Sequence, residues 1–99
     1  MPLAGAAVIL ATHPDPSIRD PAEAVRLAER AVELSTREEP VVLSTLATAY
    51  DAAGHHDRAI RAAERALQSA TELGATRGVR RIRAQLERYR AAAARPASP

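Results

Sequence analysis

Histidine and aspartate are the side chains of this sequence that could carry out acid–base chemistry or hold a metal ion. His13 lies near Asp15 and Asp20, and His55 and His56 are adjacent. Imidazole is a common metal ligand, but a closed zinc site needs four converging ligands. The side chains of His55 and His56 diverge in most backbone conformations. We therefore expect structural or surface roles for the histidines, and loop and helix-capping roles for Asp15 and Asp20.

The sequence lacks the other residue patterns that carry chemistry. It contains no cysteine, which excludes a disulfide framework, a thiolate metal site and a thiol nucleophile. It has no Ser/His/Asp signature and no glycine-rich phosphate-binding motif. Its 99 residues suffice for one domain and leave no room for a second, catalytic domain. We expect a protein that is not an enzyme, with no metal and no cofactor.

Arginine supplies all fourteen basic side chains and is concentrated towards the C-terminus. Residues 1–73 have a net charge of −4 and residues 74–99 a net charge of +6. The C-terminal arginines could contact nucleic-acid phosphates, or they could form the polar outer face of a capping helix, which repeat arrays need. We favour the cap, because aromatic side chains that stack on single-stranded bases are nearly absent. Nucleic-acid binding is the alternative.

Five helices are predicted from the apolar periodicity and from the residues that start and stop helices. Asp20, Pro21 and an acidic residue three positions after Asp20 form a strong helix start. Gly54 and Gly74 suit the left-handed residue that ends a helix. The predicted helices cover about residues 3–12, 21–35, 40–53, 57–73 and 76–94. Residues 96–99 are expected to be a frayed tail.

The sequence contains an internal repeat that spans two helices. Residues 10–12 (Leu-Ala-Thr) return at 46–48 with an offset of 36, and the alanine pattern of residues 24–31 returns at 59–66 with an offset of 35. Such a period predicts antiparallel helix pairs stacked in one layer. We therefore expect an all-α fold in one domain, residues 1–95. Its parts are repeat 1 (about 3–35), repeat 2 (about 40–73) and a capping helix (about 76–94).

The second repeat resembles the tetratricopeptide family. Leu43-x2-Leu46-Ala47-x2-Tyr50, followed by Gly54, Ala59, Ala63 and Ala66, is similar to the family pattern. The match covers residues 40–67, and residues 4–34 resemble a degenerate copy. Residues 11–16 (Ala-Thr-His-Pro-Asp-Pro), followed by Arg19-Asp20-Pro21, are similar to a loop of bacterial members. Leu43 replaces the preferred tryptophan, Ala63 replaces an aromatic residue, and no proline follows at Thr71. The resemblance implies a fragment of an α-solenoid with a concave face.

The helix expected at residues 40–53 has a second face, which points away from Leu43 and Leu46. This face consists of Val41, Ser44, Thr45, Thr48 and Ala52, and the internal repeat adds Gly5, Val8, Ile9 and Thr12. In tetratricopeptide proteins the corresponding face lines the peptide groove. The resemblance therefore implies a shallow, weakly polar groove for a peptide or helix of a partner protein. A contact with a neighbouring repeat is the other interpretation.

Residues 3–11 contain no charged side chain, so whichever face of this helix points outward is apolar. Monomeric soluble proteins rarely expose such a patch, and two-fold pairing with a second copy is the simplest closed way to cover it. We expect a homo-oligomer, either a homodimer or a domain-swapped dimer, that forms through residues 3–12, with Leu3, Val8, Ile9 and Leu10 at the contact.

No apolar run approaches the roughly 20 residues that cross a bilayer. The apolar residues near the N-terminus lack the basic segment that precedes the apolar region of a signal peptide. We therefore expect a soluble, cytoplasmic scaffold that binds an unidentified protein or peptide and does not associate with membranes.

Overall fold

The computed structural model describes residues 3–95, which form five α-helices and no strand. The helices are α1 (Leu3–Thr12), α2 (Pro21–Leu34), α3 (Pro40–Ala52), α4 (His56–Glu72) and α5 (Thr76–Ala94). The predicted all-α fold with about five helices is confirmed, and every predicted helix boundary agrees to within one residue. The predicted frayed tail, residues 96–99, lies outside the described residues. None of the described helices is long and apolar enough to cross a membrane.

Local signals in the sequence account for most of the helix ends. The backbone N–H of Glu23 donates a hydrogen bond to Asp20 Oδ1 at 3.2 Å, so Asp20 caps α2 as predicted, with Pro21 as the first helical residue. Gly54 and Gly74 have φ angles of +83° and +67° just after α3 and α4. These angles lie in the left-handed region, where glycine meets no steric penalty.

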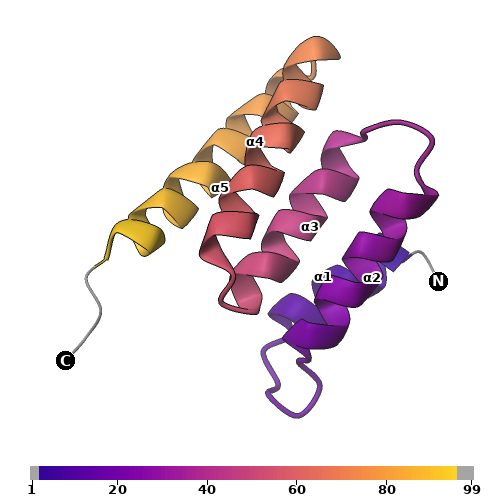
Figure 1. Cartoon of the computed structure of the whole chain (residues 1–99), viewed down its shortest axis with the longest axis vertical. Helices are drawn as coiled ribbons and strands as arrows, with labels where there is room; N and C mark the ends of the chain where they lie inside the picture. The colour runs from indigo at the N-terminus through magenta and orange to yellow at the C-terminus, as the bar shows by residue number, and fades with distance from the viewer. Residues whose placement is uncertain (1–2, 96–99) are drawn as a thin grey trace.

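The central element of the fold is α3, which contacts each of the other four helices. Figure 1 shows α2, α3 and α4 side by side, with α1 behind α2 and α5 behind α4. Helices α1 and α2 therefore pack on one side of α3, and α4 and α5 pack on the other. Neighbouring helices run in opposite directions along the chain, as helix pairs joined by short turns must.

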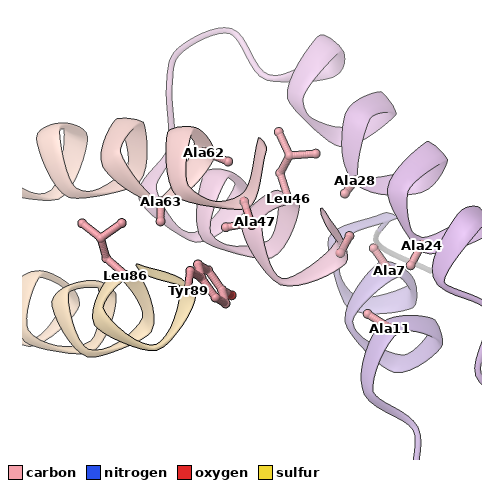
Figure 2. Packing of buried hydrophobic residues seen from close by; sticks show 12 residues of the cluster. Ala7, Ala11, Ala24, Ala28, Leu46, Ala47, Ala62, Ala63, Leu86 and Tyr89 are labelled. Atoms are coloured by element: carbon pink, nitrogen blue, oxygen red, sulfur yellow. The ribbon is translucent and has the colours of Figure 1, made fainter. Parts of the chain in front are cut away.

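The core is built mainly from alanine. Within residues 3–95, eleven of the sixteen buried apolar residues are alanines, and the larger ones are Leu43, Leu46, Ile82, Leu86 and Tyr89. Figure 2 shows alanines of α1, α2, α3 and α4 at the helix contacts, while the two larger side chains labelled on α5 fill the space beside α3 and α4. Small side chains let helix axes approach closely, but each buries little apolar surface. The fold therefore depends on many small contacts.

Polar contacts on the surface also join neighbouring elements. Arg65 pairs with Glu38 at 2.5 Å, linking α4 to the loop before α3. The Tyr50 hydroxyl donates to Glu29 at 2.8 Å, linking α3 to α2. Burial, and secondly this hydrogen bond, raise the pKa of Tyr50. Exposed pairs of this kind contribute only about 0–1 kcal/mol each, so packing dominates the stability.

We expect Ala63→Phe to destabilise the protein by about 1–3 kcal/mol, because overpacking a filled core forces strain. Ala63 lies on α4 and is fully buried, in one core cluster with residues of α3 and α5. Urea denaturation of the variant and the wild type measures the change. Ala84→Phe is the matched control, since Ala84 is exposed on α5. An unchanged or raised stability of Ala63→Phe would contradict the close packing at α4.

Candidate functional site

An open hollow of about 520 Å³ lies between α1, α3 and α5. Its lining consists of Val8, Pro40, Val41, Ser44, Thr45, Thr48, Leu73, Ala75, Gly78, Arg81 and Ile82. Five of the nine residues predicted to form a partner-binding groove are in this set. The structure therefore brings Val8 of α1 together with Val41, Ser44, Thr45 and Thr48 of α3, as the internal repeat suggested.

Large aliphatic side chains are exposed at the hollow. Val41 is 63% exposed, Leu73 is 60% exposed and Val8 is 38% exposed. They come from three parts of the chain that are far apart in sequence: α3, the turn after α4, and α1. Single exposed aliphatic residues are common on protein surfaces, whereas several that border one hollow are typical of interaction sites.

The other four predicted groove residues, Gly5, Ile9, Thr12 and Ala52, do not line the hollow. The hollow follows the N-terminal part of α3, and Ala52 is on the last turn of that helix, where it borders a different depression beside Val25 of α2. Thr12 is exposed at the end of α1, where its hydroxyl donates to the Val8 carbonyl at 2.7 Å. Thr45 lines the hollow but is buried, and its hydroxyl donates to the Val41 carbonyl at 2.9 Å. These hydroxyls already bond to their own helices.

Gln85 is a residue of this site that the sequence analysis missed. It is buried on α5, and its Oε1 accepts a hydrogen bond from Ser44 Oγ at 2.8 Å. Its Nε2 lies 3.1 Å from the Ser44 carbonyl, 3.1 Å from Thr48 Oγ1 and 2.6 Å from the Tyr89 hydroxyl. The polar part of the predicted groove therefore bonds to α5. A partner in the hollow would meet mostly aliphatic side chains.

The sequence did contain a signal for Gln85. The residue lies three positions after Ile82 and four before Tyr89, within the apolar stripe of α5, where an amide requires hydrogen-bond partners. Burial raises the pKa of Tyr89, and its hydrogen bonds with Gln85 and Thr48 act in the opposite direction. The neutral phenol is thus the form that the folded protein favours.

The exposed face of α1 differs from the predicted self-association surface. Leu10 packs against the core and Leu3 is half-buried, because both lie on the same helix face as the buried Ala7 and Ala11. Gly5, Val8, Ile9 and Thr12 form the exposed face instead. Ile9 and Val8 are therefore the large aliphatic residues that α1 exposes most, whereas Leu3 and Leu10 of the predicted surface are half-buried.

The histidines make local contacts. His13 Nδ1 accepts a hydrogen bond from the Asp15 backbone N–H at 3.0 Å, and His55 meets the Tyr50 ring edge-on, with centroids 6.3 Å apart. His56 Nδ1 lies 3.4 Å from a carboxylate oxygen of Asp51. Within residues 3–95, no group of three or more histidine, aspartate or glutamate side chains could hold a metal ion.

Asp15 has the loop role that was predicted. Its carboxylate accepts hydrogen bonds from the Ser17 hydroxyl at 2.8 Å and from the Ser17 backbone N–H at 2.9 Å. These two bonds, the side-chain one first, lower the pKa of Asp15. The carboxylate therefore stabilises the turn that leads from α1 to Asp20.

Comparisons of the chain with models of protein families, with curated proteins and with solved structures find no match. The tetratricopeptide resemblance thus stays a prediction from the sequence, and the hollow has to be interpreted from its own geometry.

Replacing Gln85 by methionine should lower stability by about 1–3 kcal/mol, because the hydroxyl of Ser44 and its neighbours lose a buried partner. Gln68→Met is the matched control. Gln68 is exposed, and among the described residues its side chain bonds only Glu72, at 3.3 Å, so its change should stay within about 0.5 kcal/mol. Chemical denaturation of both variants gives the comparison. Equal losses of stability in the two variants would show that the hydrogen bonds of Gln85 contribute no more than the single bond of the exposed Gln68.

Proposed function

We propose that this protein is a non-catalytic interaction scaffold that binds a segment of another protein in the hollow between α1, α3 and α5. The observation that carries the proposal is the group of exposed aliphatic side chains, Val8, Val41 and Leu73, which border one hollow. Burying a valine or leucine side chain in full contributes about 1.5–3 kcal/mol. These residues could therefore supply much of the affinity for a short peptide.

An extended peptide or a helix would suit this surface. The three walls of the hollow are helices or their ends, and recognition of a helix in such a groove uses apolar side chains spaced three and four residues apart. The proposal includes tetratricopeptide membership and a bacterial, cytoplasmic setting. These parts rest on the sequence resemblance and on the sequence patterns described above.

Nucleic-acid binding is the second candidate, and the arginines of α5 favour it. All of them are exposed, and only Arg90 forms an ion pair within the described part of the chain, with Glu64 at 3.2 Å. Against this candidate, neither tyrosine offers a free ring for base stacking: Tyr89 is buried, and Tyr50 is half-buried and hydrogen-bonded to Glu29. The aliphatic hollow also has no role in binding phosphates.

Selection from a displayed library of random peptides tests the scaffold function. Wild-type protein should retain peptides, and Val41→Asp should weaken their binding by about tenfold or more, because it places a carboxylate among the apolar anchors. Leu34→Asp is the matched control, since Leu34 is 59% exposed at the end of α2 and does not line the hollow. Equal losses in the two variants, or no retained peptides, would refute the proposed site.

We also propose that the exposed face of α1 pairs with a second copy of the chain. A two-fold contact brings like side chains near one another, and α1 has no charged residue that its copy would repel. Val8 belongs both to this face and to the hollow, so Ile9, which does not line the hollow, is the residue to test.

Light scattering should give a dimer mass for the wild type and a monomer mass for Ile9→Glu. Ile18→Glu should remain dimeric: Ile18 lies in the loop after α1 and is 45% exposed, close to the 43% of Ile9. A wild-type mass that stays monomeric at high micromolar concentration would contradict self-association, and it would leave the binding of another protein unaffected.

A further inference from the structure

We propose that the partner segment is an acidic amphipathic helix, whose apolar side chains enter the hollow while its carboxylates pair with a stripe of arginines on α5. We call Arg77, Arg81 and Arg88 the groove-side arginines. The inference rests on the proposed function, because it names the chemistry of the segment that the hollow binds.

Arg81 connects the apolar hollow with the charged helix. Arg81 is the one charged residue that lines the hollow, and Val8 and Val41 line the same hollow. No acidic residue lines the hollow, and α1, which forms the opposite wall, carries no charge. A carboxylate in this position would therefore meet a cation and no competing acidic group of the lining.

The groove-side arginines extend this positive charge along α5. Arg77 lies four residues before Arg81 and Arg88 lies seven after it, spacings that place all three on one face of a helix. Together they span about 16 Å, or three turns. All three are exposed, and within residues 3–95 none of them forms an ion pair.

On the flank of α5 that faces α4, acidic side chains lie beside the arginines. Arg83 and Arg90 border a depression between α4 and α5 that also contains Glu64 and Glu87. Arg90 pairs with Glu64 at 3.2 Å. Acidic side chains of the protein itself thus accompany the arginines beside α4, whereas the lining of the hollow has none. The uncompensated positive charge lies on the side of α5 where the apolar hollow is.

The combination of these features favours a protein over a nucleic acid. Charge alone would attract either polyanion. A phosphate backbone, however, has no apolar side chain to place against Val41 and Leu73, and the hollow offers no aromatic ring for a base. An amphipathic helix can satisfy both parts of the surface, with leucine-like residues on one stripe and glutamates beside it.

The same peptide selection, carried out with the full chain, tests this inference. Peptides of about 16 residues, which are ~24 Å long as helices, are long enough to span the groove-side arginines. The retained sequences should combine apolar residues three and four positions apart with flanking Asp or Glu. Fluorescein-labelled copies should bind in an anisotropy titration, with affinity that falls as salt is raised from about 50 mM to about 300 mM.

Charge reversal at Arg81 gives the decisive comparison. Arg81→Glu should weaken the peptides about tenfold, and Arg77→Glu should also weaken them, because both changes set a carboxylate against the acidic flank. Arg83→Glu is the matched control on the other flank of α5 and should change the affinity by less than about twofold. Circular dichroism checks that each exposed-site variant keeps its helices.

The other outcomes overturn the inference in distinguishable ways. Retained peptides that depend on Val41 but are not acidic, and that bind Arg81→Glu as well as wild type, would refute it and leave the proposed function standing. An absence of retained peptides would refute both. A single-stranded oligo-dT probe that binds more tightly than any peptide, is lost in Arg81→Glu and is unaffected by Val41→Asp would establish nucleic acid as the ligand class instead.

Discussion

The packing of α3 against all four other helices is the constraint on which the rest of the structure depends. One face of α3 carries Leu43, Leu46 and Ala47 into the core, and these residues hold the α1–α2 pair and the α4–α5 pair together. The face of α3 that the other helices leave open places Val41 and Ser44 at the hollow. The same helix therefore supplies both the centre of the core and the floor of the candidate site, so its rotation determines both.

The alanine-rich core explains why larger aliphatic residues lie on the surface. Helices that meet through alanine leave little space between them, and a valine or leucine at those positions would be overpacked. The inside of the protein is thus filled mainly by alanine, while Val41, Leu73 and Ile9 are exposed. This arrangement gives a modestly stabilised fold whose apolar surface is available for a partner. The small apolar area buried in the core and the apolar surface proposed for binding therefore have one cause, the use of alanine where the helices meet.

Gln85 couples the position of α5 to that of α3. Its amide bonds to Ser44 and Thr48 of α3, which favours the rotation of α5 that directs Ile82 and Leu86 into the core. In that rotation, one flank of α5 borders the hollow and the other borders α4. The distribution of arginines between an uncompensated flank and a compensated one therefore follows from a polar contact within the protein.

The five helices and their ends could be predicted from local signals in the amino-acid sequence. Asp20 caps the chain segment that follows it, and Gly54 and Gly74 adopt the left-handed angles that follow a helix end. The internal repeat likewise predicted that α1 and α3 would share the hollow. Tertiary structure decided which face of each helix is covered: it turned Leu10 towards the core and placed Gln85 on the predicted groove. These outcomes depend on how helices rotate and cross, which is set by contacts between residues far apart in sequence.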